Sequence, residues 1–299
     1  MENGDNMKQI KMIVCDLDGT LLNEEQKILT NNIEILKALQ KQGIILVLAS
    51  GRNYMKIKDY GLQLDMDLYQ GYFIGGNGVF LSDACGNKIY EEKKMTIEQA
   101  QKIITYLMQY QEEIITLFDD GLFCYLPKMI KDQKLKLIKQ YQLDPNVLTC
   151  GPYDDFVDHR KNYPKLKYIE DVNAIDRAVN KVCMKVNEAK LKQIYPFIVK
   201  DLNDYWCGCV SSMWLEITLK TINKAHMVRK LCELVNISLD EVIAFGDGEN
   251  DIELLKSVGK AIAMGNALPQ VKALCDEVCL DHNQDGIYQA LKLHTKINL

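Results

Sequence analysis

Two aspartates, Asp16 and Asp18, end an apolar run in the segment VCDLDGTLL, and a glycine follows at once. Burying a carboxylate is costly unless a cation or hydrogen bonds compensate for the lost hydration. The acids are therefore either polar residues of a surface turn or members of a site that needs two carboxylates. Residues two apart in a strand point to the same side, so both side chains can face one site, although the strand is ending there.

Further polar groups follow two other apolar runs. Asp247 ends EVIAFGD, and Ser50 ends IILVLAS. Three carboxylates at one place would repel one another unless a divalent cation lay between them, and hard oxygen ligands of this kind suit Mg2+, which pairs well with phosphate. Lys224 could neutralise phosphate oxygens, while Ser50 and the Gly51 amide offer hydrogen-bond donors. This set predicts phosphoryl transfer, in which positioning and charge neutralisation are most of the catalysis.

Four other residues stand near these motifs, and three of them have two interpretations each. Asn250 and Asp251 open the segment NDIELLKS, which we expect to be a helix whose N-terminal dipole favours an anion. Asp251 is equally well interpreted as a helix-capping acid or as a support for the metal. Arg52 could contact substrate, but an ion pair at a helix start is the commoner role. We expect Asn77 to be a turn residue in a left-handed conformation rather than a functional one.

Strands and helices alternate in the two outer thirds, and they must position these residues. The first third predicts a strand in IKMIVCD, a helix in TNNIEILKALQKQG capped by Thr30 or Asn31 and stopped by Gly43, a buried strand in IILVLAS and a hairpin in DLYQGYFIGGNGVFLSD. The last third predicts a helix in KAHMVRKLCELVN that Lys224 just precedes, a strand in EVIAFGD, a helix in NDIELLKSVG and a short strand in KAIAMGNA. Such units imply an α/β fold with a Rossmann-like parallel-sheet core, in which ligands bind outside the carboxyl ends of the strands.

The middle of the chain differs from both ends. Residues 88–218 are rich in Lys and Tyr, and their predicted elements alternate less regularly. The predicted helices include TIEQAQKIITYLMQYQEE and NAIDRAVNKV, and the predicted strands include GLFCYL, KVCMKVN and SMWLEITLK. We expect this part to be an inserted α+β cap domain, with residues 1–87 and 219–299 forming the catalytic core.

Composition excludes several classes of protein. The net charge of −5 argues against a nucleic-acid partner, because phosphate backbones favour basic surfaces. No stretch is apolar enough to span a bilayer, and the N-terminal MENGDNMKQI lacks the apolar core of a signal peptide. We therefore expect a cytoplasmic protein with no membrane partner.

The ten cysteines predict reduced thiols rather than a metal centre. The close pairs, Cys207 with Cys209 and Cys275 with Cys279, do not make the C-x-x-C pattern of a zinc site. Most of the cysteines are scattered among apolar residues and are expected to be small core residues, including Cys15, which should face away from Asp16, and Cys85, Cys124, Cys150, Cys183 and Cys232.

Four segments, DLDGTLL, LASGR, NKAHMV and GDGENDIELL, resemble in this order the four motifs of the haloacid dehalogenase superfamily of phosphatases. The segments GGNGVF, AIAMGNALPQVK and DEVCLDHNQDGI are similar to the Cof-type subfamily (subfamily IIB) of sugar-phosphate phosphatases. A single D-x-D pair is weakly specific, whereas four motifs in the right order are strongly specific. The resemblance covers nearly all of both outer thirds.

The resemblance implies a role for each matching position. Asp16 would be the nucleophile that forms an aspartyl-phosphate, and Asp18 would be the general acid for the leaving oxygen and then the base for water. The Mg2+ ligands would be Asp16, the backbone carbonyl of Asp18 and Asp247, with Asp251 supporting the metal or the lysine. Ser50 and Lys224 would hold the phosphate, and the further phosphate-binding candidates are Leu17, Gly51 and Asn250.

The spacing of the motifs indicates where the cap is inserted. Only one helix and one strand fit between Asp18 and Ser50, whereas more than half of the chain lies between Ser50 and Lys224. The cap therefore follows the second motif, as it does in the Cof-type and phosphomannomutase-like branch, and not the first.

Our leading hypothesis is a Mg2+-dependent phosphatase that acts on small phosphorylated metabolites, first of all sugar phosphates, as a monomer or weak homodimer. One alternative is a hexose-phosphate phosphotransferase or mutase of the phosphomannomutase-like branch. Another is a non-catalytic protein that binds phosphorylated metabolites. The complete set of acids argues against this last alternative, because a sensor need not keep Asp18.

Overall fold

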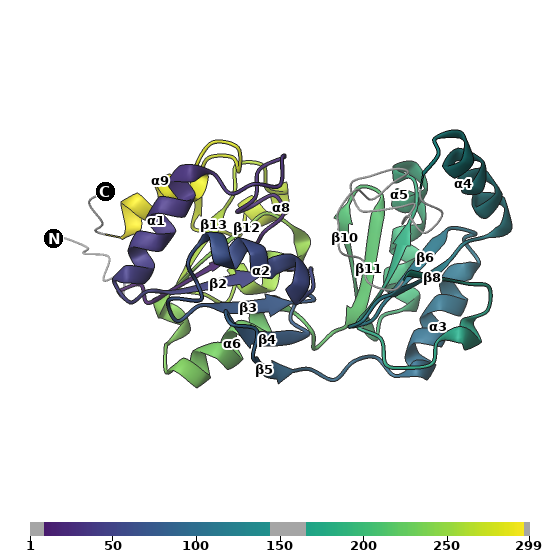
Figure 1. Cartoon of the computed structure of the whole chain (residues 1–299), viewed down its shortest axis with the longest axis horizontal. Helices are drawn as coiled ribbons and strands as arrows, with labels where there is room; N and C mark the ends of the chain where they lie inside the picture. Colours follow the sequence, from purple (N-terminus) through teal and green to yellow (C-terminus); the bar gives the residue numbers. More distant parts are fainter. Residues whose placement is uncertain (1–8, 144–165, 296–299) are drawn as a thin grey trace. The chain divides into compact units, whose positions relative to one another are not determined.

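The computed structural model of the chain describes residues 9–143 and 166–295. The chain divides into two compact units, which we call the core unit (Met1–Glu92 with Thr221–Leu299) and the inserted unit (Lys93–Lys220) (Figure 1). Both combine helices with a sheet, so the expected α/β architecture is confirmed. Within the described ranges, no helix is both long and apolar enough to cross a membrane.

The core unit is built on an eight-stranded sheet in the order β14-β13-β12-β1-β2-β3-β4-β5. Neighbouring strands are parallel from β14 to β3, whereas β3, β4 and β5 pair in antiparallel fashion. The strands are β1 (Met12–Cys15), β2 (Ile45–Ala49), β3 (Tyr72–Gly75), β4 (Phe80–Asp83), β5 (Lys88–Glu91), β12 (Val242–Gly246), β13 (Lys260–Ala263) and β14 (Glu277–Val278).

Helices connect the parallel strands and cover the sheet. They are α1 (Thr30–Lys41), α2 (Tyr54–Gln63), α6 (Lys224–Val235), α7 (Ile252–Leu255), α8 (Pro269–Lys272) and α9 (Gly286–His294), with short 3-10 helices at Leu239–Glu241 and Glu249–Asp251. Helix α1 packs beside α9 (Figure 1), and α6 packs against α7. Because crossovers are right-handed, α1, which leads from β1 to β2, and α7, which leads from β12 to β13 in the opposite direction, lie on opposite faces. The direction reverses between β1 and β12, and this switch point is where open α/β sheets bind ligands.

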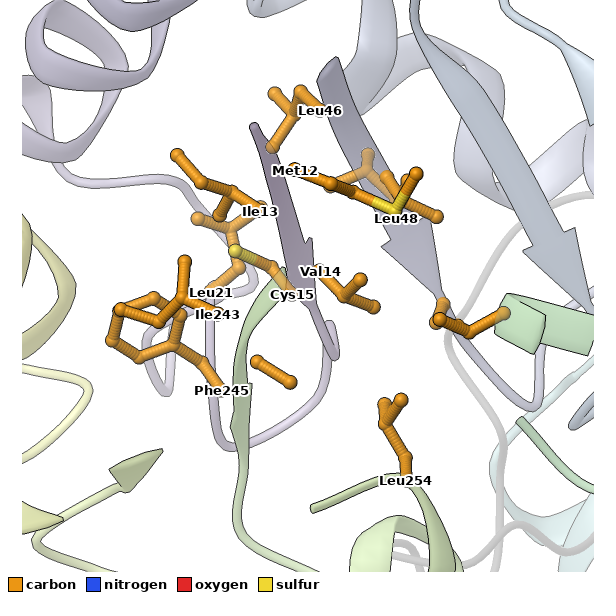
Figure 2. Packing of buried hydrophobic residues seen from close by; sticks show 14 of the residues in the cluster. Met12, Ile13, Val14, Cys15, Leu21, Leu46, Leu48, Ile243, Phe245 and Leu254 are labelled. Atoms are coloured by element: carbon orange, nitrogen blue, oxygen red, sulfur yellow. The ribbon is translucent and has the colours of Figure 1, made fainter. Parts of the chain in front are cut away.

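Strand β1 is buried on both faces, as its continuous apolar run predicts. In Figure 2, Ile13 and Cys15 lie on the same side of β1 as Phe245, whereas Val14 lies on the other side. Because side chains alternate along a strand, Asp16 continues the side of Val14, and Cys15 points away from it as expected.

The inserted unit contains a six-stranded sheet in the order β10-β11-β9-β6-β7-β8, which is antiparallel except between β7 and β8. One face packs against α3 and α5 and forms a separate hydrophobic core. The strands are β6 (Glu113–Leu117), β7 (Leu122–Tyr125), β8 (Leu166–Ile169), β9 (Lys181–Lys185), β10 (Tyr205–Ser211) and β11 (Trp214–Leu219). The helices are α3 (Ile97–Met108), α4 (Lys128–Gln140) and α5 (Glu188–Asp201), with a 3-10 turn at Val172–Ala174.

Two expectations for the range 88–218 differ from the structure. NAIDRAVNKV is not a helix: after the single turn Val172–Ala174, Val179 pairs with Met95, and β9 begins at Lys181. The position of β9 between β6 and β11 overrides the local helical pattern. Strand β5 completes the core sheet, although it lies inside the range 88–218 expected for the cap.

Two helix starts also need correction. Helix α1 starts at Thr30 and is preceded by Leu29, which makes no side-chain cap, so neither Thr30 nor Asn31 is the N-cap. The segment NDIELLKS begins within the 3-10 turn Glu249–Asp251 and continues as the four-residue helix α7, and Asp251 folds back onto the backbone amides of Asp247 and Gly248, just before the segment. A helix this short provides little of the expected dipole.

The expectation for the cysteines holds in part. Cys15, Cys124, Cys183 and Cys232 are buried, whereas Cys85 is exposed at the turn after β4. Cys150 lies outside the described residues.

Candidate active site

The predicted polar residues lie at the carboxyl ends of three adjacent strands. Asp16 directly follows β1, and its amide donates to Phe245 O of β12 at 3.2 Å. Ser50 follows β2, and its amide donates to Ile74 O of β3 at 2.8 Å. Asp247 directly follows β12. The parallel register brings these groups to one edge of the sheet, at the switch point.

Lys224 joins two of the predicted acids. It is the first residue of α6, not the residue before the helix as expected, and its side chain is fully buried. Its Nζ donates to Asp16 Oδ1 at 2.5 Å and to Asp251 Oδ1 at 2.6 Å. Asp251 is also fully buried, and its Oδ2 accepts the backbone amides of Asp247 and Gly248, each at 3.1 Å. Asp251 therefore fixes both the lysine and the loop that carries Asp247.

The electrostatics show an excess of negative charge. Burial raises the pKa of Asp16 well above its usual value, and the charges of Asp251 and Asp247 raise it further, although Lys224 opposes them. Burial, together with the charge of Asp251, raises the pKa of Asp247 to about 7. Burial alone would lower the pKa of Lys224, but the charges of Asp16 and Asp251 outweigh it and raise that pKa. A cation added among these carboxylates would favour their charged forms.

Three carboxylates could share a metal ion. One oxygen each of Asp16, Asp247 and Asp251 lies within 4.8 Å of the others. Thr20, a fully buried residue, donates its hydroxyl to Asp247 Oδ1 at 2.8 Å and so orients that carboxylate. Both oxygens of Asp251 already accept hydrogen bonds, one from Lys224 and the other from backbone amides. A divalent cation, which prefers hard oxygen ligands, would therefore be held mainly by Asp16 and Asp247.

Asp18 is held by Arg52. The guanidinium donates from Nε to Asp18 Oδ2 at 2.8 Å and from Nη2 to Asp18 Oδ1, which makes a two-point contact. The guanidinium of Arg52 lies over the ring of Tyr60 and also donates to the side-chain carbonyl of Gln26. The ion pair expected at a helix start therefore involves the predicted acid itself, which fixes the orientation of that carboxylate.

The predicted phosphate-binding residues make their own hydrogen bonds with the loops that follow β1, β2, β3 and β12. Ser50 is buried and accepts the amide of Arg52 at 3.2 Å. Asn250 donates from Nδ2 to Asn77 Oδ1 at 3.0 Å, so the loops after β12 and β3 meet. The Leu17 side chain is fully buried, and its carbonyl accepts the amides of Thr20 and Leu22, so only its backbone amide could face a phosphate.

Sequence reasoning missed several members of this site. Thr20 stands within the quoted DLDGTLL but was not identified as an orienting residue. Asn77 was interpreted only as a turn residue; its left-handed φ of 59° confirms the turn, and its contact with Asn250 is additional. Asn266, in the AMGNA segment, donates to Gly19 O at 2.8 Å. Its position inside a family-like segment was the available signal.

Comparison with known proteins agrees with this geometry. Residues 13–291 match the family of haloacid dehalogenase-like hydrolases. The HMP-PP phosphatase of Yersinia pseudotuberculosis is 28% identical over 263 residues, which cover 88% of this chain and 86% of that protein. A haloacid dehalogenase-like hydrolase from Bacteroides thetaiotaomicron has a solved structure with a TM-score of 0.72 and 26% identity, covering 95% of this chain and 99% of that one.

A second solved structure, that of the subclass IIB sugar phosphatase BT4131, shares the fold with a TM-score of 0.73 at 22% identity, covering 95% of this chain and 98% of that one. These matches extend across both units, so the family resemblance of the four motifs is confirmed. The chain belongs to the haloacid dehalogenase-like hydrolases.

Proposed function

We propose that the protein is a Mg2+-dependent phosphatase that hydrolyses small phosphorylated metabolites, with sugar phosphates as the leading class, through an aspartyl-phosphate at Asp16. The observation that carries this proposal is the position of Lys224 Nζ, 2.5 Å from Asp16 Oδ1 and 2.6 Å from Asp251 Oδ1, beside Asp247 at the switch point. A buried carboxylate with a cationic neighbour and further acids suits attack on a phosphate group.

In the first step, a carboxylate oxygen of Asp16 attacks phosphorus, and the ester P–O bond breaks. The leaving oxygen takes a proton from Asp18, which Arg52 keeps oriented. In the second step, Asp18 removes a proton from water, the water oxygen bonds to phosphorus, and the P–O bond to Asp16 breaks. Phosphate leaves, and both aspartates return to their initial states.

We assign the cation to Asp16, Asp247 and the backbone carbonyl of Asp18, with Asp251 in support. The donors are hard oxygens, and burial together with the neighbouring carboxylates raises the pKa values of Asp16 and Asp247, so a divalent cation such as Mg2+ fits these residues. When bound, the ion neutralises charge on the phosphate oxygens and orients the group for in-line attack. Ser50, Lys224 and Asn250, with the amides of Leu17 and Gly51, would hold the remaining phosphate oxygens.

The inserted unit would select the substrate. The core unit holds the nucleophile, the acid and the phosphate-binding residues, so this chemistry does not require a further group. Lids on such sites commonly exclude water and contact the leaving group. We therefore infer that the inserted unit, expected at residues 88–218 and spanning Lys93–Lys220, acts as a substrate-specificity cap, and that a cytoplasmic monomer or weak homodimer acts without a nucleic-acid or membrane partner.

The test is phosphate release from a panel of sugar phosphates, nucleotides and HMP-PP, the compound in the name of the Yersinia relative. We expect turnover that requires Mg2+ and disappears in Asp16→Asn. Each reaction should also be run with a hexose bisphosphate, because dependence on such an activator would favour a mutase. Turnover in excess chelator, or in Asp16→Asn, would refute the proposal.

A further inference from the structure

The turn between β3 and β4, residues 76–79, was expected to do no more than reverse the chain. Its φ values are 61° at Gly76, 59° at Asn77 and 108° at Gly78. Three consecutive left-handed residues are uncommon, and asparagine is among the few side chains that adopt this region without great strain. Asn77 is only 4% exposed, so its amide is directed into the protein rather than into solvent.

The backbone of this turn is bonded to the segment that carries Ser50. The amide of Asn77 donates to Ser50 O at 2.9 Å, and the amide of Gly76 donates to Arg52 O at 2.9 Å. Between these two bonds lies Gly51, where an added Cβ would be 3.1 Å from Asn77 Oδ1. The side chain of Asn77 therefore lies directly over the loop predicted to bind phosphate.

The side chain of Asn77 also reaches the loop after β12. Asn77 Oδ1 accepts from Asn250 Nδ2 at 3.0 Å. A side-chain amide nitrogen carries two hydrogens, so this bond uses one and fixes the direction of the other. Asn250 can then offer its second N–H to a phosphate in a fixed orientation.

Gly78, in the same turn, lies against the start of α6. An added Cβ on Gly78 would be 2.3 Å from Asn223 O. Asn223 caps α6 by accepting the amide of His226 at 2.8 Å, and the next residue is Lys224. The turn thus contacts the helix cap that places the lysine.

We propose that Asn77 is a positioning residue that aims the Asn250 amide at the phosphate, within a turn that joins the loops bearing Ser50, Lys224 and Asn250. The inference rests on the phosphatase function proposed above, since it concerns the same site. It assigns Asn77 no contact with substrate: its effect on phosphate passes through Asn250.

The test is a double-mutant cycle of Asn77→Gly and Asn250→Ala in the full chain. Glycine removes the amide and keeps the positive φ, so it avoids the strain that alanine would add. We expect Asn77→Gly to lower both the affinity for inorganic phosphate, measured by calorimetry with Mg2+, and kcat/KM for para-nitrophenyl phosphate by about tenfold. With Asn250→Ala already present, the same change should cost less than about twofold.

Asn236→Gly is the matched control, because Asn236 has a φ of 54° at the exposed C-terminal end of α6. It should leave phosphate affinity and turnover unchanged. Equal losses from Asn77→Gly with and without the Asn250 amide would overturn the inference, as would no loss at all. A wild-type protein that binds phosphate but hydrolyses no ester would refute the proposed function. The inference about Asn77 would then be tested by the phosphate affinities of the double-mutant cycle without the kinetic data. A wild type that binds no phosphate would overturn both.

Discussion

In the inserted unit, buried Glu216 accepts from Lys181 at 2.5 Å, and buried Glu113 pairs with Lys134. In the core unit, Asp16 and Asp251 share Lys224, and no lysine or arginine within the described ranges pairs with Asp247. Each of these two carboxylates of the inserted unit lies beside a lysine, whereas the described part of the core unit places only Lys224 among the three carboxylates Asp16, Asp247 and Asp251.

This difference separates a structural ion pair from a binding site. A balanced buried pair needs no further group, and removing one partner leaves an uncompensated charge. In an unbalanced cluster the carboxylates repel one another; burial, together with this repulsion, raises the pKa values of Asp16 and Asp247, and an added cation would favour their charged forms. The comparison predicts that neutralising a carboxylate should cost activity in the core unit and stability in the inserted unit.

Asp16→Asn should have the largest effect. An amide is a poor nucleophile and a poor metal ligand, so kcat for any phosphate ester should fall at least about a thousandfold, or about 4 kcal/mol in the barrier. The free energy of unfolding without Mg2+ should not fall, because one of several repelling charges is removed while Lys224 keeps Asp251. Steady-state assays and urea unfolding measure the two effects, and a marked loss of stability would contradict the comparison.

Glu216→Gln should show the opposite pattern. It leaves Lys181 buried without its charged partner, and the free energy of unfolding should fall by about 3 kcal/mol. Trp214 Nε1, 3.2 Å from Glu216 Oε1, can still donate to the amide oxygen. Glu188→Gln, in the exposed pair with Lys192, is the control and should cost less than about 0.5 kcal/mol. Equal losses in the two variants would show that the buried pair is not structural.

Mg2+ should stabilise the wild type before any substrate is added. At about one hundred times its Kd, the ion should raise the free energy of unfolding by about 2.7 kcal/mol, measured by thermal or urea unfolding. Asp247→Asn should lose most of this gain, whereas Glu216→Gln should keep it. Ca2+ should not restore turnover well, because it takes more ligands at longer distances. Equal stabilisation of Asp247→Asn would remove that residue from the metal site.

Arg52→Lys should have the smallest effect, one that depends on the leaving group. Lysine keeps the charge but cannot make the two-point contact with Asp18, so protonation of the leaving oxygen should suffer. We expect about a tenfold loss of kcat for alkyl phosphates and a smaller loss for para-nitrophenyl phosphate, whose leaving group needs less help. Arg177→Lys, in an exposed pair with Asp120, is the control. Equal losses for both esters would mean that Arg52 does not act through Asp18.

The parts of the fold that could be predicted are those with local signals. Strands such as Met12–Cys15 are buried on both faces and appear as continuous apolar runs, and the polar residues after them mark one edge of a parallel sheet. The wrong helix in NAIDRAVNKV had a helical local pattern, but pairing of Val179 with Met95 and of β9 with its neighbours decided the outcome. Strand pairing between distant segments cannot be predicted from the residue pattern of a short segment.

The site was predictable in its acids and lysine, but not in the contacts that orient them. Asp18 with Arg52 and Asn77 with Asn250 join segments that only the folded sheet brings together. Thr20 is a common residue type whose role depends on where its hydroxyl points. The catalytic roles themselves stay predictions until the variants above are measured.

The central claim is that the carboxylates at the edge of the core sheet catalyse ester hydrolysis through transient phosphorylation of Asp16. Borohydride added during turnover should reduce the acyl phosphate to an alcohol, and peptide mass spectrometry should then find homoserine at position 16. The account predicts this product with wild type and substrate, and none in Asp16→Asn or without substrate. Full turnover with no reduced residue at position 16, or with the reduction at another aspartate, would contradict it.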